Sequence, residues 1–437
     1  MATNPFPRPR RALAAVVSCF LLLAGAARGQ DKPASLSKEK LDAITGVLKK
    51  AVDDKKFAGG TALIAQRGKI VYRADVGMQD VEGKVPIAEG TIFRIASMSK
   101  PITSVAVMIL VDEGKLNVTD PLSRYVPEFK EMKVLVPGKD GKSYETVAAA
   151  RAITIHDLLT HTSGITYRLL NKPILAKLYA DAGVTDGLSE TAGTIGDNVK
   201  KLAKLPLTCQ PGSAWEYGLN TDVLGYVVEV VSGKTLAEFC RERIFEPLKM
   251  GDTWFVLPKE KWSRLSALNV TGKDKKLTRV GDETVTIDGL VVSANNPARD
   301  DNKYYSGGAG LVSTAGDYFR FCQMMLNRGE LDGARVLRAE TADRMTRNQL
   351  GEIRIMFPGN DLMGYGFGVL SEKAKETTKD PRGVGSYAWG GAFGTFFWVD
   401  PKNELIGVFM CQVWPPEFIL AEEIKRLTYE ALSDGKK

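Results

Sequence analysis

The sequence predicts an α/β fold in which helices and strands alternate within one body and a mainly helical lobe is inserted at about residues 116–250. Segments with helical periodicity and segments with strand-like alternation follow each other closely along the chain. No internal repeat, low-complexity tract or linker separates them. After a predicted leader, roughly 400 residues remain, which is enough to bury a large core.

Residues 1–29 have the pattern of a secretory signal peptide. Arginines within residues 8–11 precede an apolar stretch at 12–26, and small residues at 27–29 suit a cleavage site. The apolar stretch is shorter than the ~20 residues of a membrane span. We therefore expect an exported protein, periplasmic or secreted, with residues 30–437 as its mature domain and no stable membrane span. We do not expect lipid attachment at Cys19, because the apolar stretch continues beyond it.

The charge of the predicted mature chain is modest. The formal net charge of the whole chain is +7, and four arginines belong to the leader, so residues 30–437 carry 7 − 4 = +3. Basic side chains are scattered among acidic ones, which argues against nucleic-acid binding.

Four widely spaced cysteines, none in a C-x-x-C pair, remain after the leader. Export would permit disulfides, and four cysteines allow three pairings. Free, buried thiols are the simpler expectation in a chain of this size. The residues are Cys209, Cys240, Cys322 and Cys411.

The N-terminal part of the mature domain alternates helix and hairpin. Residues 36–54 have helical periodicity, and residues 59–80 alternate around a turn at Arg67-Gly68 like a β-hairpin. A second hairpin is predicted at 133–147, turning at Asp140-Gly141.

A serine and a lysine three residues apart open the most apolar predicted helix. Residues 102–111 are apolar on nearly every face, which predicts a helix buried all round. Pro101 fits only a first helical turn, so Ser97 lies at or just before the N-terminus. The helix dipole and free backbone N–H groups at that end can hold an oxyanion.

This pair has the chemistry of a nucleophile and its base. A serine hydroxyl needs a base at hydrogen-bond distance, and a lysine serves when burial disfavours its charged form. The alternative is that Ser97 caps the helix and Lys100 is solvated. The same S-x-x-K spacing occurs at three further places, all in polar segments: Ser35/Lys38, Ser37/Lys40 and Ser433/Lys436.

Both histidines of the chain lie in the short predicted helix 153–164. They are His156 and His161, five residues apart, whereas two zinc ligands on one helix face lie four apart, and no H-E-x-x-H occurs. We therefore expect no metal. His161 is either a catalytic base or, as we favour because no G-x-S-x-G elbow is present, a structural hydrogen-bonding residue.

The C-terminal elements follow in order. A polar helical segment spans 171–205 and is a candidate mobile cover or a plain helical subdomain. Apolar helices are predicted at 223–231 and 317–327. Strands are predicted at 386–399 and 405–413, and the last helix spans about 417–432.

Six sequence blocks resemble the serine β-lactamase and penicillin-binding superfamily. They are similar to its branch of class C β-lactamases and family VIII carboxylesterases, and they follow the family's order. The likeness extends over nearly the whole mature chain. The blocks are FRIASMSK, ITIHDLLTHTSGI, LPLTCQPGSAWEYG, GYVVEVVSGKTLAEFCRERIFEPLKMGDTWF, SGGAGLVSTAGDYFRF and YAWGGAFGTFFWVDP. The resemblance implies a β-lactamase/DD-peptidase-like fold with an antiparallel sheet flanked by helices.

The resemblance also implies roles for individual residues. Ser97 matches the family nucleophile and Lys100 its partner base. Tyr217 matches the tyrosine that relays the proton to the leaving group, and a phenol beside an ammonium ion gives up its proton more readily. The backbone N–H groups of Ser97 and Ala392 match the oxyanion hole.

Two motifs depart from the family's common pattern. The second motif is commonly Y-x-N, but Asn220 follows Tyr217 one place late, which puts its contact with substrate in doubt. The third is commonly K-T-G, whereas Trp389, Gly390 and Gly391 stand here. In the family that lysine binds a substrate carboxylate, which a tryptophan cannot do, while the glycines let substrate lie against the strand.

The expected function is hydrolysis of small neutral carboxylic esters through an acyl-enzyme on Ser97, with no metal or organic cofactor. One alternative is a β-lactamase or D-alanyl-D-alanine carboxypeptidase that acts on β-lactam-like or cell-wall substrates. The other is a binding protein that keeps the fold without turnover.

Overall fold

The computed structural model describes residues 36–433, apart from Leu169, Asn171, Glu190, 273–275, Asp288, 297–300 and 356–358. These residues belong to one compact unit, Ala34–Lys437. The predicted signal segment 1–29, with Cys19, lies outside the described residues.

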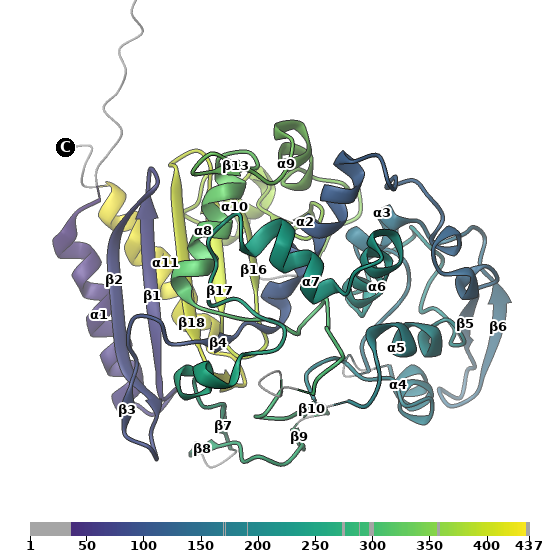
Figure 1. Cartoon of the computed structure of the whole chain (residues 1–437), viewed down its shortest axis with the longest axis horizontal. Coiled ribbons are helices and arrows are strands. Elements are labelled where there is room, and N and C mark those ends of the chain that lie inside the picture. The colour runs from purple at the N-terminus through teal and green to yellow at the C-terminus, as the bar shows by residue number, and fades with distance from the viewer. Residues whose placement is uncertain are drawn as a thin grey trace, which may run out of the picture. The chain divides into compact units, whose positions relative to one another are not determined.

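An antiparallel sheet forms the centre of the fold (Figure 1). Its eight described strands follow the order β14-β15-β16-β17-β18-β1-β2-β3, and every neighbouring pair is antiparallel. The strands are β1 Gly59–Gln66, β2 Lys69–Asp80, β3 Val85–Pro86, β14 Leu362–Met363, β15 Gly368–Val369, β16 Tyr387–Gly390, β17 Phe396–Asp400 and β18 Leu405–Cys411. Smaller strands outside this sheet are β4 Phe93–Arg94, β5 Lys133–Pro137, β6 Tyr144–Ala148, β7 Asn269–Thr271, β8 Leu277–Arg279, β9 Val285–Ile287, β10 Leu290–Val292, β11 Val312–Ser313, β12 Glu330–Leu331, β13 Ala334–Arg335 and β19 Val413–Trp414.

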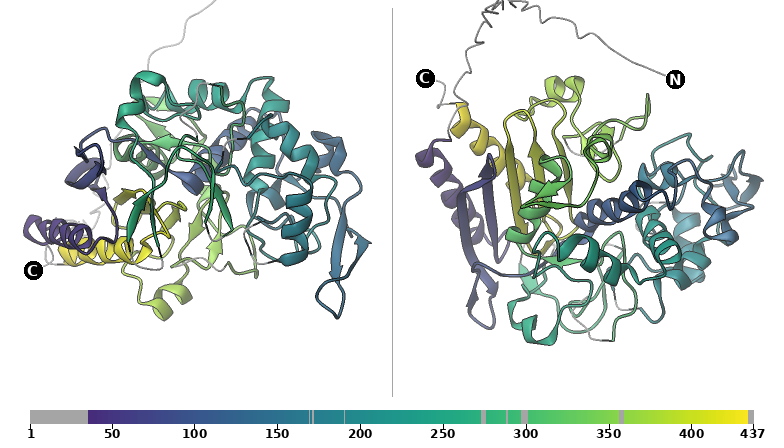
Figure 2. Two further views of the ribbon diagram at one scale, coloured as in Figure 1. Left: turned by 90° about the horizontal axis from the view of Figure 1, so that it is seen from below. Right: turned by 45° about the horizontal axis from the view of Figure 1, so that its top comes forward.

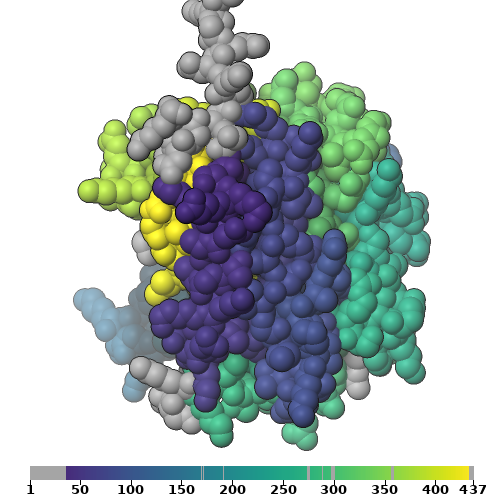
Figure 3. All heavy atoms as spheres, turned by 90° about the vertical axis from the view of Figure 1, so that its left-hand side faces the viewer, coloured from purple at the N-terminus to yellow at the C-terminus, as the bar shows by residue number. Residues whose placement is uncertain are grey.

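Helices cover both faces of this sheet. The helices of the described chain, including those of the lobe beside the sheet, are α1 Lys38–Asp53, α2 Ser99–Asp112, α3 Ile155–Leu159, α4 Pro173–Asp181, α5 Ile195–Leu202, α6 Asn220–Ser232, α7 Leu236–Cys240, α8 Ala315–Leu326, α9 Ala339–Met345, α10 Glu372–Thr378 and α11 Phe418–Ser433. Helices α1 and α11 pack with Ile64 and Trp398 in one apolar cluster, whereas α2 and α8 pack with Leu63 and Phe397 in another. Successive strand residues point to opposite faces, so each strand feeds two cores. Figure 3 looks onto the side of α1, with α11 beside it.

The segment 116–250 forms a mainly helical lobe beside the sheet (Figures 1 and 2). It contains α3 to α7 and the hairpin β5–β6. Helix α2 packs against α6 and α7 of the lobe, and the short 3-10 helix that precedes α2 packs against β16 of the sheet. The antiparallel sheet, its flanking helices and the inserted lobe are confirmed.

Two predicted elements divide in the structure. The predicted strand 386–399 is a hairpin of β16 and β17, because the Gly391 N–H donates to the Thr395 carbonyl at 2.7 Å and closes a turn between them. The predicted helical segment 171–205 consists of α4 and α5, separated by a loop with left-handed Gly183, Gly187 and Gly193.

The four cysteines of the mature domain have free thiols. Cys209 is partly exposed, and the other three are buried. Along the described part of the chain, no helix has the length and apolar character needed to cross a membrane.

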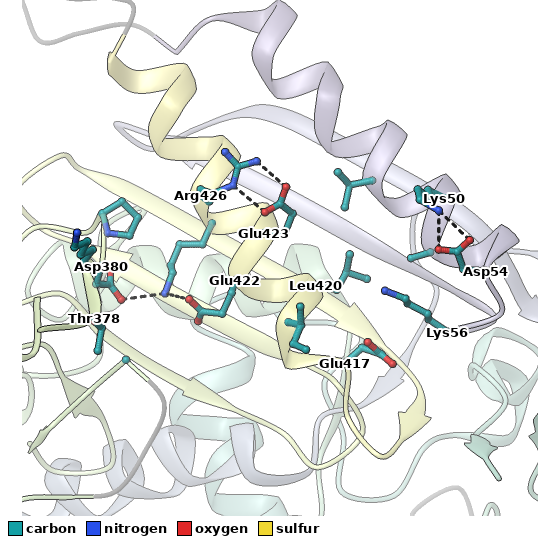
Figure 4. Close-up of a pocket in the computed structure, with 17 residues that line it drawn as sticks. Lys50, Asp54, Lys56, Thr378, Asp380, Glu417, Leu420, Glu422, Glu423 and Arg426 are labelled. Atoms are coloured by element: carbon teal, nitrogen blue, oxygen red, sulfur yellow. Dashed lines mark hydrogen bonds and ion pairs between the residues drawn. The ribbon is translucent and has the colours of Figure 1, made fainter. Parts of the chain in front are cut away.

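A buried ion cluster joins the loop after α10 to α11 (Figure 4). Asp380 accepts two hydrogen bonds from the Arg382 guanidinium, at 2.9 and 2.8 Å, and one from Lys425 Nζ at 3.0 Å. Burial alone would raise the pKa of Asp380, but Arg382 and Lys425 lower it to about 2. The cluster borders a cavity of about 650 Å³ that is also lined by Lys50 of α1 and by Asp54, the residue after α1.

Replacing Asp380 with asparagine is expected to lower the free energy of unfolding at pH 7 by about 3 kcal/mol, because the buried Arg382 guanidinium loses its counter-ion. Lys425 loses one of two carboxylates and keeps its ion pair with Glu422. The wild-type contribution is present above the ordinary carboxyl pKa of 3.8 and is lost as the pH falls toward about 2. Urea unfolding at pH 7 and pH 3 measures both effects. Asp54→Asn is the matched control, because its ion pair with Lys50 is exposed on the same cavity and is worth less than about 1 kcal/mol. Equal losses in the two variants would contradict the role of the cluster.

Candidate active site

Ser97 lies at the entrance of a buried helix. It belongs to the 3-10 turn Ala96–Met98, which leads directly into α2. Residues 99–110 are all buried, as the apolar pattern predicts, whereas Ser97 is partly exposed. Ala96 has φ +42°, a left-handed conformation that is strained for a residue with a Cβ. The backbone is thus held in an unusual shape immediately before the serine.

Two side chains meet the Ser97 hydroxyl. Lys100 Nζ donates to Ser97 Oγ at 3.0 Å, and the Tyr217 hydroxyl donates to the same oxygen at 2.7 Å. Lys100 is 1% exposed and also donates to the Tyr167 hydroxyl at 2.9 Å and to the Gly308 carbonyl at 2.8 Å. Three oxygen atoms therefore lie within hydrogen-bond distance of the Lys100 nitrogen, and one of them is Ser97 Oγ. The structure therefore brings together the three residues predicted to be catalytic, although their roles stay predictions.

Tyr217 is held by the loop after α3. The Glu216 N–H donates to the His161 carbonyl at 2.7 Å, and a Cβ on Gly218 would lie 2.2 Å from the Ile165 carbonyl oxygen. The Trp215 ring stacks on Tyr217 at 5.8 Å. The glycine permits the close approach of two loops, and this approach fixes where the phenol points.

His161 lies behind Tyr217 rather than on Ser97. Its ring centroid is 5.0 Å from that of Tyr217, and its Nδ1 lies 2.9 Å from Asn220 Nδ2. Burial, and then the Lys100 charge, lower the pKa of His161 well below its usual value, so the ring is neutral. These contacts agree with the structural role favoured from the sequence.

Asn220 is fully buried at the start of α6. Its amide nitrogen also donates to the Ile165 carbonyl at 3.2 Å, and its oxygen accepts from Ser163 at 2.5 Å. The extra residue between Tyr217 and Asn220 thus places this amide inside the His161 loop. A direct contact with substrate stays a prediction.

The end of β16 lies against the serine turn. A Cβ on Gly391 would lie 2.3 Å from the Ile95 carbonyl oxygen, and Thr395 Oγ1 donates to that oxygen at 3.3 Å. Ala392 follows and is partly exposed, and no acceptor is described for its backbone N–H in this part of the structure. The two segments predicted to form the oxyanion hole therefore adjoin.

Trp389 and Gly390 are the last two residues of β16, directly before Gly391. Trp389 is fully buried, with its ring 6.5 Å from His161 and parallel to it, and 5.9 Å from Tyr217. A Cβ on Gly390 would meet the Phe418 ring at 3.1 Å. The tryptophan therefore supports the aromatic group around Tyr217, and its predicted contact with substrate stays a prediction.

Three groups at the site were not predicted. Tyr167 and the Gly308 carbonyl bind Lys100, and Asp222 is a buried carboxyl beside Gly308. Asp222 could have been found from the sequence, because it is an acidic residue at the start of an otherwise apolar helix. The glycines at 307, 308 and 310 could likewise have predicted that the backbone there approaches another segment closely. Within the described residues, no cluster of histidine, cysteine and carboxylate side chains suits a metal ion.

Comparisons with known proteins identify the family of the chain. The family model described as Beta-lactamase matches residues 44–430. Esterase EstB of Burkholderia gladioli is 33% identical over 367 residues, which cover 82% of this chain and 86% of that protein. Protein Rv1367c of Mycobacterium tuberculosis (strain ATCC 25618 / H37Rv) is 33% identical over 388 residues, or 86% of this chain and 90% of that protein.

A solved structure shares the whole fold. EstCE1, described as a hydrolase with promiscuous acyltransferase activity, superposes with a TM-score of 0.76 at 27% identity and covers 90% of this chain and 99% of its own. The family match spans most of the chain, and two relatives exceed 30% identity. The chain therefore belongs to the beta-lactamase family of serine hydrolases.

Proposed function

We propose that this enzyme cleaves small neutral carboxylic esters through an acyl-enzyme on Ser97. The observation that carries the proposal is the double contact at one oxygen, with Lys100 Nζ at 3.0 Å and the Tyr217 hydroxyl at 2.7 Å from Ser97 Oγ. A serine hydroxyl becomes a nucleophile when a proton acceptor lies within hydrogen-bond reach. The likeness to Esterase EstB supports an ester as substrate.

The reaction has two halves. Before the attack, one member of the Lys100–Tyr217 pair is unprotonated, either as the Lys100 amine or as the Tyr217 phenolate. Ser97 Oγ attacks the ester carbonyl carbon and its proton passes to that member, while the N–H groups of Ser97 and Ala392 hold the carbonyl oxygen as it becomes an anion. The C–O bond to the alcohol breaks, and Tyr217 returns the proton to the leaving alkoxide. Water then attacks the acyl carbon, releases the acid and restores Ser97.

The fully buried Trp389 favours neutral substrates. No cation replaces it at this position of β16, so an anionic substrate gains no ion pair there. One relative, from Escherichia coli (strain K12), is named as a putative D-alanyl-D-alanine carboxypeptidase and is 27% identical over 372 residues. The experiment below therefore also includes a cell-wall-type peptide as a substrate.

Turnover of p-nitrophenyl butyrate, nitrocefin and a peptide ending in D-alanyl-D-alanine by residues 30–437 tests the proposal, with Ser97→Ala beside each substrate. We expect ester hydrolysis that the variant lacks, little nitrocefin turnover, and a butyryl adduct on Ser97 by mass spectrometry. Faster turnover of nitrocefin or of the peptide would replace the proposal with the corresponding alternative. Ester hydrolysis that survives in Ser97→Ala would exclude the nucleophile.

We further propose that the enzyme works outside the cytoplasm. The basic, apolar and small-residue order of residues 1–29 supports this. Expression of the full chain, followed by mass spectrometry of the N-terminus in the exported fraction, should find a chain that begins near Gln30. An intact Met1 terminus confined to the cytoplasm would contradict export.

A further inference from the structure

A buried carboxyl lies next to the catalytic lysine without a role in the scheme above. Asp222, on the first turn of α6, is 0% exposed. Its Oδ1 accepts from the Tyr304 hydroxyl at 3.2 Å, whereas its Oδ2 has no hydrogen-bond partner among the residues that the structure describes. A carboxylate in such a place is costly unless a nearby positive charge compensates it.

Gly308 shows how closely Asp222 approaches Lys100. A Cβ on Gly308 would lie 2.6 Å from Asp222 Oδ2, 3.1 Å from the Tyr167 hydroxyl and 3.4 Å from Lys100 Nζ. Carboxyl oxygen and amine nitrogen therefore converge on one point. The glycine keeps this point free of a side chain, and Asp222 Oδ2 and Lys100 Nζ are at most 2.6 + 3.4 = 6.0 Å apart.

We infer that Asp222 is a positioning residue whose carboxylate balances the positive charge that the Lys100–Tyr217 pair gains when Ser97 gives up its proton. The inference rests on the proposed function, because it concerns the same acylation step. The proton moves from Ser97 Oγ to the pair; Asp222 takes no proton and forms no bond. The negative charge of Asp222 close to Lys100 stabilises the protonated Lys100–Tyr217 pair. It therefore also stabilises the transition state in which Ser97 transfers its proton to that pair.

The charged and hydroxyl groups around Asp222 come from several elements. Lys100 faces it from α2 and Asp186 from the lobe, and the hydroxyls of Tyr304 and Ser306 face it from the segment before β11. The groups that face Lys100 itself are Tyr167, Tyr217, His161 and Asp222.

These surroundings predict when Asp222 is ionised. Burial raises the pKa of Asp222 to about 6, although Ser306, Lys100 and Tyr304 stabilise the anion. Burial holds the pKa of His161 well below the usual value of a histidine. Burial also holds the pKa of Tyr167 well above the usual value of a tyrosine. A rise in Ser97 reactivity near pH 6 therefore reports Asp222 and not the histidine.

The test measures the reactivity of Ser97 directly. Residues 30–437, as wild type and as Asp222→Asn, react with a p-nitrophenyl alkylphosphonate between pH 5 and pH 8.5, and the first-order burst of nitrophenol gives the rate of phosphonylation. We expect the wild-type rate to rise through about pH 6, as Asp222 ionises. Asp222→Asn should react roughly 10- to 100-fold more slowly at pH 8 and show no rise near pH 6.

Asp317→Asn is the matched control. Burial also raises the pKa of Asp317 to about 6, but this carboxyl lies at the start of α8, where the Asp252 N–H and the Thr253 hydroxyl bind it. Its variant should keep both the wild-type rate and the rise. An Asp222→Asn variant that keeps the rise, or that reacts at the wild-type rate at pH 8, would overturn the inference.

Tyr304→Phe gives a second reading if Asp222→Asn does not fold. Loss of a hydroxyl that stabilises the carboxylate raises the pKa of Asp222, so the rise should move to higher pH, and an unmoved rise contradicts the inference. Ester assays on the same samples separate the two proposals. Phosphonylation with the expected rise but without ester turnover defeats the ester proposal alone, whereas ester turnover with an unaffected Asp222→Asn defeats the inference alone.

Discussion

Replacing Lys100 with methionine is expected to lower kcat/KM for ester hydrolysis by about 10,000-fold, because members of a nucleophile–base unit fail together. Methionine is an unbranched side chain that fits the same buried channel, so the fold should persist. It cannot donate to Ser97 Oγ, the Tyr167 hydroxyl or the Gly308 carbonyl, all three of which Lys100 Nζ holds at 3.0 Å or less. Steady-state kinetics with p-nitrophenyl butyrate, beside circular dichroism, measures the loss.

Lys38→Met is the control for this change. Lys38 belongs to another S-x-x-K copy, but its side chain is 86% exposed and pairs with Asp42 on the surface of α1. Its replacement should leave turnover unchanged. The double variant Ser97→Ala/Lys100→Met should be no slower than Ser97→Ala, because both residues serve one step. More than a tenth of the wild-type activity in folded Lys100→Met would refute the base assignment.

Replacing Gly391 with alanine is expected to lower kcat by about 100- to 1,000-fold with a small change in KM, since removal of one oxyanion donor costs this much. The added Cβ would lie 2.2 Å from Thr395 Oγ1 and 2.3 Å from the Ile95 carbonyl oxygen. The oxygen at Ile95 belongs to the backbone, so the strand end must move away from the serine turn. Ala392 moves with it, and its N–H leaves the place where the oxyanion develops.

Separate kcat and KM values for Gly391→Ala test this account, with Gly251→Ala as control. Gly251 has no atom within 4 Å of a built Cβ, so alanine there should change neither value. A folded Gly391→Ala with wild-type kcat would show that the oxyanion is held elsewhere.

Local pattern predicted the elements around the nucleophile well. The apolar run 102–111 predicted α2, and Pro101 placed Ser97 at its entrance. Both signals come from adjacent residues and need no knowledge of packing. Helix α3 likewise begins at a capping box made by two nearby residues, Thr154 and Asp157.

Contacts between distant segments were beyond such patterns. Lys100 and Gly308 are 208 residues apart, and no periodicity links them. Tyr217 entered through resemblance to a family rather than through spacing. The hairpin β16–β17 was missed because apolar residues continue through its turn, which the Gly391–Thr395 hydrogen bond defines only after folding.

Helix α2 lies between the sheet and the lobe, so the proposed activity depends on the docking of these two parts. The lobe contributes Tyr217 and Tyr167, the turn after β16 contributes Ala392, and the 3-10 turn at the start of α2 carries Ser97. Under the proposed mechanism, a chain with its lobe folded but undocked would lack the proton relay, and a chain with a displaced end of β16 would lack the site for the oxyanion. Ester hydrolysis would thus require that the lobe and the sheet are docked against each other. Loss of activity on heating would then occur when the lobe and the sheet first separate, before either of them unfolds.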